Sequence, residues 1–299
     1  MQILLTGGSG LIGSALIKHL TNQHTIIVLT RNTIKAAQKL DNKVKLITQL
    51  SEVDFNHTDV VINLAGEPIA DKRWSKHQKD IIEQSRWQIT QQIVDKIKAS
   101  ETPPHTLISG SAIGYYGRQS NAPIDETFQD CFPEFTHSLC NKWEQIALEA
   151  ESPYTRVCLV RTGIVLASRG GVLGKMLPAF KLGLGGPIST GEQVMSWVHI
   201  DDMVQLLLHI LNTKQLSGAI NATSPKPVSN AEFSKLLAST LKRPNAFRVP
   251  KFLLQQLLGE MSDLLLYGQN IIPQKLLDSG FVFQYPDIES AFSQLLKHQ

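Results

Sequence analysis

Three glycines near the start of the chain have the spacing of a phosphate-binding turn. The segment TGGSGLIG places Gly7, Gly10 and Gly13 in the pattern G-x-x-G-x-x-G, between two apolar runs. In such a turn the first glycine permits a tight bend, the second lets the backbone approach a diphosphate, and the third lets the helix pack closely on the strand. The start of the helix then offers free N–H groups and a positive dipole end. The segment predicts a dinucleotide site, because an ordinary strand-to-helix turn rarely needs so many glycines.

The residues after the second apolar run indicate which dinucleotide would bind. A site for NAD usually has a carboxylate about 20 positions after the glycines, where it binds the ribose 2′-hydroxyl. In this chain the run HTIIVLTR ends in Thr30 and Arg31 instead. Guanidinium groups form charge-assisted hydrogen bonds with phosphate. We therefore predict that Arg31, aided by the Thr30 hydroxyl, binds the 2′-phosphate of NADP; the alternative is a solvated arginine after a strand.

The composition and residue spacing argue against a nucleic-acid partner, a metal site and membrane attachment. The 299 residues are 42% hydrophobic with a formal net charge of +3, which suits one large or two modest globular domains. The basic residues form no run, so no nucleic-acid partner is expected. The three cysteines and nine histidines lack metal-ligand spacing, which predicts no metal site and a reducing compartment. Because the apolar N-terminus lacks a basic leader and later apolar runs are short, we expect a cytoplasmic protein without membrane attachment.

Alternating strand and helix patterns must position these groups. Apolar or β-branched runs predict strands over residues 2–5, 24–31, 59–66, 105–117 and 155–166, and helical spacing predicts helices over residues 11–20, 74–99 and 135–151. This alternation predicts an α/β fold, a Rossmann doubly wound parallel sheet with helices on both faces. Residues 1–223 are expected to form the NADP-binding domain. Residues 224–299 are expected to form a smaller, mainly helical substrate lobe, to which a loop insertion around 167–195 also belongs.

The motifs TGGSGLIG, NLAGEPI, SGSAIGYYG, RTGIVL and WVHIDD together resemble the extended short-chain dehydrogenase/reductase superfamily. The resemblance is closest to its atypical branch of "epimerase family" proteins, which join an NAD-dependent epimerase/dehydratase-like domain to a C-terminal domain of unknown function. Segments such as GLGGP and GQNIIPQKLL extend the resemblance over essentially the whole chain. It implies a Rossmann domain that binds NADP, with a substrate lobe over the carboxyl edge of the sheet.

The resemblance also implies a set of cofactor contacts. Arg86, on the long helix, is expected to reach the phosphates or the substrate, and Val165 is expected to flank the nicotinamide. Core packing is the alternative for Val165, and both roles are compatible because backbone atoms alone can make such contacts. The implied cofactor-binding residues are Gly7, Gly10, Leu11, Ile12, Gly13, Thr30, Arg31, Leu64, Ala65, Gly66, Arg86 and Val165.

The catalytic pattern of the family is incomplete in this chain. Family members use a serine or threonine, a tyrosine and, four residues later, a lysine that lowers the pKa of the tyrosine. Ser111 lies at the serine position, but Thr136 and Cys140 occupy the tyrosine and lysine positions. Tyr115 is the preferred replacement as proton donor, with Tyr116 as the alternative. Without a cation near it, such a phenol would have a pKa of about 10.

Several other polar groups admit two interpretations. Arg161, at the end of a strand, either holds an anionic substrate or forms an ion pair. Cys140 is expected to be a small buried residue rather than a nucleophile, and Lys142 is expected to be solvated. Asp201 or Asp202 is expected to cap the helix that follows WVHI.

These features predict an NADP(H)-dependent oxidoreductase or epimerase. Its substrate would be a small carbonyl or hydroxyl compound, for example a nucleotide-linked sugar, with Ser111 holding the reacting oxygen. The alternative is an NADPH-binding sensor or regulator that has lost turnover, which the missing Tyr-x-x-x-Lys pair favours. The retained Ser111 loop and the substrate lobe favour the enzyme. The expected partner is a small-molecule substrate, and the chain is expected to be a monomer or a homodimer.

Overall fold

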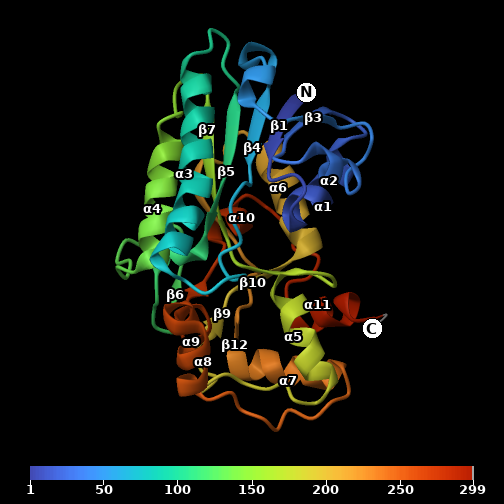
Figure 1. Ribbon diagram of the computed structural model, residues 1–299, viewed down its shortest axis with the longest axis vertical. Coiled ribbons are helices and arrows are strands. Elements are labelled where there is room, and N and C mark those ends of the chain that lie inside the picture. The colour runs from blue at the N-terminus through green and yellow to red at the C-terminus, as the bar shows by residue number, and fades with distance from the viewer. Residues whose placement is uncertain (298–299) are drawn as a thin grey trace.

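A seven-stranded parallel sheet forms the centre of the computed structural model, which describes residues 1–297 (Figure 1). Every neighbouring pair of strands in this sheet is parallel, so the predicted Rossmann doubly wound sheet is confirmed. The chain adds strands to one side of the first strand and then to the other, which creates a switch point beside it. In spatial order the strands are β11 (Gly218–Ala222), β7 (Arg156–Thr162), β5 (Thr106–Ala112), β4 (Val60–Asn63), β1 (Gln2–Thr6), β2 (Thr25–Leu29) and β3 (Lys45–Ile47).

Helices cover both faces of this sheet because successive side chains of a strand point to opposite sides. Ile3 and Leu5 of β1 belong to the apolar cluster beneath α1 and α6, whereas Leu4 belongs to the cluster beneath α3 and α4. All three side chains are fully buried. In Figure 1, α3 and α4 lie together on one side of the sheet and α1 and α6 on the other. These helices are α1 (Leu11–Leu20), α3 (Lys76–Lys98), α4 (Phe135–Leu148) and α6 (Ile200–Asn212).

The strand expected over residues 155–166 is interrupted at Gly163. Beyond this residue, β8 (Ile164–Leu166) leaves the central sheet and pairs with β10 (Trp197–His199). The backbone of Gly163 lies so close to the neighbouring chain that a Cβ atom there would be 2.7 Å from the carbonyl oxygen of Ser196. A continuous apolar run did not reveal this change of sheet, because both segments are apolar and the break depends on a distant neighbour.

The C-terminal part of the chain is mainly helical, as predicted. Leu177 of α5, Phe233 of α7 and Phe292 of α11 share one apolar cluster, while Phe281 and Phe283 pack into the cluster beneath α1 and α6. The division into domains at residues 223 and 224 remains a prediction, and the last two residues of the expected lobe, His298 and Gln299, lie outside the described residues. The helices of this part are α5 (Gly171–Lys181), α7 (Asn230–Thr240), α8 (Lys251–Leu258), α9 (Asp263–Leu266), α10 (Gln274–Asp278) and α11 (Ile288–Leu295).

Short elements complete the described chain. Among them, β6 pairs with β13 and β9 pairs with β12, which joins segments that are distant in sequence. They are α2 (Thr33–Ala37), η1 (Leu50–Glu52), η2 (Phe55–His57), η3 (Ile113–Tyr116), β6 (Pro123–Ile124), β9 (Val194–Met195), β12 (Val228–Ser229), η4 (Gly259–Ser262) and β13 (Asn270–Ile271).

The prediction that Asp201 or Asp202 caps α6 is wrong. The N-cap is His199, whose Nδ1 accepts a hydrogen bond of 3.0 Å from the amide of Asp201. The carboxylate of Asp202 is buried and accepts hydrogen bonds from the amides of Gln284 at 2.7 Å and Tyr285 at 2.9 Å. The aspartate therefore satisfies backbone groups of the C-terminal segment, which a local capping pattern does not indicate.

Arg156 fastens the other end of α6 to the sheet. Its guanidinium donates hydrogen bonds to the carbonyl oxygens of Ile210 (2.7 Å), Leu211 (3.1 Å), Thr213 (2.8 Å) and Leu216 (2.7 Å). The last carbonyls of a helix have no partner inside the helix and carry partial negative charge. One cation on β7 therefore satisfies the end of α6 and the turn that leads to β11.

Replacing Arg156 by leucine is expected to lower the free energy of unfolding by about 3 kcal/mol, because several carbonyl groups lose charge-assisted donors. Urea denaturation followed by circular dichroism measures this change. The control is Lys98→Ala, which removes an exposed ion pair with Glu149 and is expected to change stability by less than about 1 kcal/mol. Equally small effects of the two substitutions would contradict the role assigned to Arg156.

Candidate functional site

The predicted site residues gather where the strands of the central sheet end. Gly7 follows β1, Arg31 lies just beyond β2 and Leu64 follows β4. Ser111 and Arg161 are the second-last residues of β5 and β7. Because the strands are parallel, their carboxyl ends meet at one edge of the sheet, where ligands of such folds bind at the switch point.

The glycine turn after β1 lies in very close contact with its surroundings. Gly7 has a φ angle of +71°, and a Cβ atom on it would lie 2.4 Å from the carbonyl oxygen of Leu64. A Cβ atom on Gly13 would lie 2.4 Å from the carbonyl oxygen of Gly7. The amide of Gly10 closes the turn with a hydrogen bond of 3.0 Å to that same oxygen. Any side chain at position 7 or 13 would force the turn away from β4 or from α1.

The first turn of α1 is suited to an anion. The N-cap residue of this helix is Gly10, and within residues 1–297 no side-chain hydrogen bond caps the helix there. The first turn contains no acidic residue. Ser9 and Gly10 are exposed, and Leu11 and Ile12 are partly buried. The first amides of a helix lack partners within it and attract negative charge. Together with the close-packed glycines, this cradle fits the diphosphate of a dinucleotide.

Arg31 is an exposed cation at the end of β2. Its side chain is 93% exposed, and its Nη1 lies 3.9 Å from Oε2 of Glu67. Such an exposed contact contributes little free energy, so the guanidinium is free to turn toward a phosphate. Thr30 is held by a hydrogen bond of 2.9 Å from its amide to the carbonyl of Ile47, and its hydroxyl accepts one of 3.3 Å from the amide of Asn32.

The backbone after β4 is fixed by a chain of buried hydrogen bonds. The Thr6 hydroxyl donates to Oδ1 of Asn63 at 2.6 Å and accepts from the amide of Ala65 at 3.2 Å. Nδ2 of Asn63 donates to the Thr90 hydroxyl on α3 at 2.9 Å. These contacts hold residues 64–66 beside the glycine turn.

Arg86 of α3 lies against this same backbone. A Cβ atom on Gly66 would lie 2.9 Å from Cζ of Arg86. The guanidinium lies 5.3 Å from the ring centre of Trp143 on α4, and its Nη1 donates to the carbonyl of Ile82 at 2.9 Å. Burial lowers the pKa of Arg86.

Val165 lies in β8, opposite Val198 of β10, and is partly buried against the cluster beneath α6. A Cβ atom placed on Gly171 would lie 3.2 Å from the carbonyl oxygen of Val165 and 3.3 Å from a methyl group of Leu11. The start of α5 therefore adjoins both Val165 and the first turn of α1.

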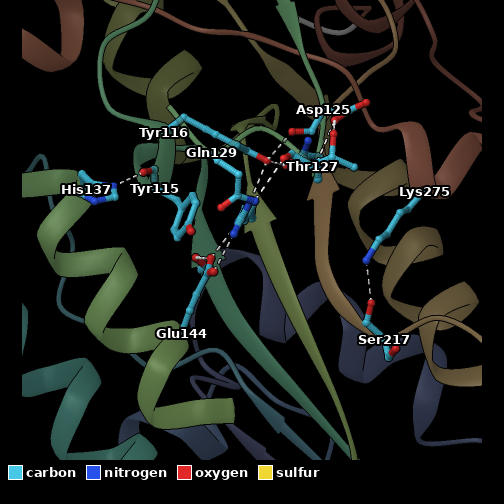
Figure 2. Close-up of polar contacts among 12 residues, drawn as sticks. Tyr115, Tyr116, Asp125, Thr127, Gln129, His137, Glu144, Ser217 and Lys275 are labelled. Atoms are coloured by element: carbon cyan, nitrogen blue, oxygen red, sulfur yellow. Dashed lines mark hydrogen bonds and ion pairs between the residues drawn. The ribbon is translucent and has the colours of Figure 1, made fainter. Parts of the chain in front are cut away.

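A buried polar network lies at the ends of β5 and β7 (Figure 2). We call it the Glu144 network. It comprises Ser111, Tyr116, Glu144, Arg161 and Asn221, and each of these residues is at most 5% exposed. The Ser111 hydroxyl donates to Oε1 of Glu144 at 2.6 Å, and Arg161 binds both carboxylate oxygens, at 2.9 and 2.8 Å. Arg161 also donates to the Tyr116 hydroxyl at 2.9 Å, which in turn donates to Oδ1 of Asn221 at 2.8 Å.

Tyr115 borders this network. Its ring points from η3 toward the Glu144 carboxylate in Figure 2, and the guanidinium of Arg161 lies 3.5 Å from the ring centre. A cation therefore does lie beside this phenol. Burial nevertheless raises the pKa of Tyr115, and the charge of Arg161 opposes this only in part. Burial likewise raises the pKa of Tyr116 to about 12.

The other ambiguous groups have one role each in this structure. Arg161 forms an ion pair: burial alone would lower its pKa, but the hydrogen bonds and charge of Glu144 raise it. Cys140 is buried, and burial raises the pKa of its thiol to about 12, as expected of a packing residue. Lys142 is exposed, with its Nζ 4.1 Å from the ring centre of Trp87.

Glu144 is the residue that the sequence analysis missed. It follows Thr136 and Cys140 at intervals of four, so the three side chains share one face of α4, and all three are buried. A carboxylate on a buried helical face needs a cationic or hydrogen-bonding partner. That mismatch is visible in the sequence, although the identity of the partner is not.

Residues 1–297 contain no group of three or more histidine, cysteine, aspartate or glutamate side chains that could hold a metal ion. None of their helices combines the length and apolarity needed to cross a bilayer.

Comparison with known proteins places the chain in a family. The model of the "NAD dependent epimerase/dehydratase family" matches residues 3–222, and the model of a "Domain of unknown function (DUF1731)" matches residues 249–295. The chain belongs to the NAD-dependent epimerase/dehydratase family. The resemblance to its "epimerase family" branch is thereby confirmed.

Relatives of similar length carry the same description. The "Epimerase family protein SDR39U1 homolog, chloroplastic" of Arabidopsis thaliana is 37% identical, over 99% of this chain and 87% of its own length. "Epimerase family protein YfhF" of Bacillus subtilis is 36% identical, over 99% and 98%. The structure of human epimerase family protein SDR39U1 (isoform 2) with NADPH matches all of both chains, with a TM-score of 0.91 and 30% identity. UDP-glucuronic acid 4-epimerase from Bacillus cereus, 17% identical with a TM-score of 0.76, shares the fold.

Breaking the Glu144–Arg161 ion pair from one side is expected to destabilise the fold. Arg161→Met leaves a buried carboxylate without its cation, which is expected to lower the free energy of unfolding by roughly 3–5 kcal/mol. The double variant Glu144→Leu with Arg161→Met removes both charges and is expected to regain part of that loss. Urea denaturation of Arg161→Met, Glu144→Leu and the double variant tests this. A double variant whose loss equals the sum of the two single losses would show that the charges are not coupled.

Proposed function

We propose that this protein binds NADP(H) along the carboxyl edge of the sheet and exchanges hydride with a small carbonyl or hydroxyl substrate, such as a nucleotide-linked sugar. The observation that carries the proposal is the glycine cradle, in which Gly7 and Gly13 leave no room for a Cβ atom beside the uncapped start of α1. The similarity to a human protein solved with NADPH supports the choice of coenzyme. A nucleoside-diphosphate sugar epimerase from Corynebacterium glutamicum, 29% identical with a TM-score of 0.78 over all of this chain and 59% of that chain, supports the substrate class.

We assign one binding role to each group along the carboxyl edge of the central sheet. The amides of Leu11 and Ile12 would meet the diphosphate beside Gly10, and Arg31 with Thr30 would bind the 2′-phosphate. The backbone of residues 64–66 would run beside the coenzyme, and Val165 would flank the nicotinamide. Bound NADPH would supply hydride from its nicotinamide C4, and NADP would accept it there.

Tyr115 and Ser111 are assigned to the reacting oxygen of the substrate. Because burial raises the pKa of Tyr115, its phenol stays protonated at neutral pH, which suits proton donation during reduction more than proton removal during oxidation. The Ser111 hydroxyl, held by Glu144 at 2.6 Å, has lone pairs that can accept a hydrogen bond from a substrate hydroxyl. The protonated Tyr115 favours a reductive reaction, whereas Ser111, whose proton is donated to Glu144, can hold the substrate oxygen only in its hydroxyl form.

A second function, an NADPH-binding sensor or regulator without turnover, is favoured by one observation. The position where the resemblance implies a lysine is Cys140, a buried thiol whose pKa is raised to about 12, so it supplies no charge. In either role we propose a cytoplasmic monomer or homodimer.

Arg31→Ala is expected to weaken NADPH binding by roughly 10- to 100-fold and to leave NADH binding unchanged, because only NADPH carries the 2′-phosphate. Glu67→Gln, which removes the negative charge 3.9 Å from Arg31, is expected to shift the preference toward NADPH. Calorimetric titration with both coenzymes measures the ratio of affinities. Lys35→Ala, which removes an exposed cation on α2, is the control. If the ratio is the same in Arg31→Ala as in the wild type, Arg31 does not select the coenzyme.

Ser111→Ala is expected to reduce turnover by roughly 100-fold or more once a substrate is found, because the reacting oxygen loses its hydrogen-bond partner. The assay follows oxidation of NADPH in the presence of carbonyl compounds and nucleotide sugars. Ser109→Ala, a buried serine of the same strand outside the Glu144 network, is the control. Tight NADPH binding with no compound consumed would favour the sensor, whereas turnover that Ser111→Ala abolishes would exclude it.

A further inference from the structure

Six exposed apolar side chains gather on two neighbouring segments of the C-terminal part. Residues 181–190 begin at the end of α5, and residues 241–258 comprise the loop after α7 together with α8. The two segments hold 28 residues, yet six of the 14 exposed large apolar side chains in residues 1–297 belong to them. We call these two segments the lobe strip. Its exposed large apolar residues are Leu182, Leu184, Phe247, Phe252, Leu253 and Leu257.

Hydrogen bonds hold the two segments of the lobe strip side by side. The amide of Val249 donates to the carbonyl of Pro187 at 3.0 Å, and the amide of Ser189 donates to the carbonyl of Val249 at 2.9 Å. Nε of Arg243 donates to the carbonyl of Lys181 at 2.8 Å. In Figure 1 the loop after α7 and helix α8 lie at the lower end of the molecule, opposite the end that carries the N-terminus. The strip is therefore one connected stretch at the far end of the C-terminal part.

Helix α8 directs apolar side chains outward. None of its eight residues is buried. Phe252, Leu253 and Leu257 are 68%, 38% and 63% exposed, whereas Leu254 and Leu258 are partly buried. At about 100° per residue, the three exposed side chains fall within one arc of the helix, and the two leucines fall on its other side. Exposed phenylalanine and leucine side chains on one face indicate a surface that an apolar medium covers.

The lobe strip is also basic throughout. It contains five of the 29 lysine and arginine residues and none of the 26 aspartate and glutamate residues. The rest of the chain, with 24 basic and 26 acidic residues, has a formal net charge of −2. All five cations are exposed, and within residues 1–297 no carboxylate forms an ion pair with them. They are Lys181, Lys242, Arg243, Arg248 and Lys251. Positive charge is thus concentrated where apolar side chains are exposed.

The first two carboxylates after α8 already have cationic partners outside the strip. Glu260 binds Nζ of Lys79 on α3 at 2.6 Å. Asp263 binds Nη2 of Arg118 at 3.0 Å. These carboxylates therefore leave the charge of the lobe strip unbalanced.

Charge complementarity indicates what covers the lobe strip. In a symmetric dimer the same surface meets itself, which would bring the five cations of one copy against those of the other. A nucleic acid would match the charge, but the leucine side chains have no ring on which bases could stack. An anionic lipid surface matches both properties, because its headgroups attract lysine and arginine and its acyl chains accept phenylalanine and leucine.

We propose that the lobe strip docks on a membrane surface that contains anionic lipids. The exposed side chains of α8 enter the boundary of the acyl chains, and the five cations contact the headgroups. No helix in residues 1–297 is long and apolar enough to span a bilayer, but contact with its surface needs no such length. The proposal replaces the sequence-based expectation of no membrane attachment, and it does not depend on the coenzyme site.

Co-sedimentation of the full chain with lipid vesicles tests the proposal. Vesicles of phosphatidylcholine alone are compared with vesicles that contain phosphatidylcholine and phosphatidylglycerol in equal parts. The affinity for the anionic vesicles is expected to be roughly 10-fold higher or more, because the five cations are attracted to the negative surface. Raising NaCl to about 0.5 M is expected to weaken this binding several-fold, because salt screens exposed charges.

Two double variants separate the apolar and the charged contributions. Phe252→Ser with Leu257→Ser is expected to weaken binding to the anionic vesicles by roughly 10-fold or more, because apolar surface is lost from the contact. Lys181→Gln with Lys251→Gln is expected to weaken it by roughly 10-fold and to reduce its dependence on salt, because two cations are removed.

Matched controls lie outside the lobe strip. Val282→Ser removes an apolar side chain that is 85% exposed. Lys39→Gln with Lys43→Gln removes two exposed lysines that precede β3. Neither control is expected to change vesicle binding. Circular dichroism verifies that every variant is folded.

The outcomes are distinct. Salt-sensitive binding to anionic vesicles that both strip variants weaken supports the proposal. Absence of binding, equal binding to both kinds of vesicle, or binding that either strip variant leaves unchanged overturns it. Sedimentation equilibrium gives an independent check, since a wild-type dimer that Phe252→Ser with Leu257→Ser converts to a monomer would assign the strip to a second copy of the chain and overturn the membrane role.

Discussion

The close approach of the glycine turn to the end of β4 is the constraint on which the rest of the site depends. No side chain fits between Gly7 and the carbonyl of Leu64, since a Cβ atom would lie 2.4 Å from that oxygen. The adjacent register pairs Thr6 with Asn63, and their side chains share a hydrogen bond of 2.6 Å. This fixes the turn, the start of α1 and the backbone of residues 64–66 relative to one another. The same backbone then sets where the Arg86 guanidinium can lie, so one packing contact links the diphosphate cradle to the neighbouring cation.

Helix α4 organises the two polar systems beside this contact. Trp143 faces Arg86 on α3, and the next residue, Glu144, faces Arg161 and Ser111 at the ends of β7 and β5. The helix therefore lacks the tyrosine and lysine implied by the family resemblance but still positions an aromatic ring against Arg86 and a carboxylate against Ser111 and Arg161. Burial raises the pKa of Tyr115, the charge of Arg161 opposes this only in part, and the charge of Glu144 acts in the same direction as burial. Burial in the network thus keeps the proposed proton donor protonated.

Polar contacts also connect the C-terminal part to the sheet. Asn221 of β11 accepts a hydrogen bond from Tyr116 and donates one of 3.0 Å to the carbonyl of Ile272. The buried carboxylate of Glu126 accepts a hydrogen bond of 2.9 Å from the amide of Asn221 and one of 3.3 Å from the amide of Lys275. The Glu144 network is therefore continuous, through Tyr116 and Asn221, with the segment that belongs to the expected substrate lobe. The carbonyl of Ile272 is connected to Arg161 through three successive hydrogen bonds, by way of Asn221 and Tyr116.

Local sequence patterns were sufficient to predict the features that depend on residues a few positions apart. The glycine spacing, the alternation of strands and helices, and the guanidinium in place of a carboxylate after β2 are all local patterns, because strand and helix periodicities and turn geometry act over short distances. The tertiary structure alone decided which helices face which strands and therefore which polar groups meet. Glu144 and Arg161 are 17 residues apart on different elements. The chain leaves the central sheet at Gly163, where the backbone lies against Ser196. Asp202 accepts hydrogen bonds from amides of a distant segment, while His199 caps α6. These pairings depend on burial between segments far apart in the chain, where an unpaired charge or amide is unfavourable, and no local pattern identifies the partner.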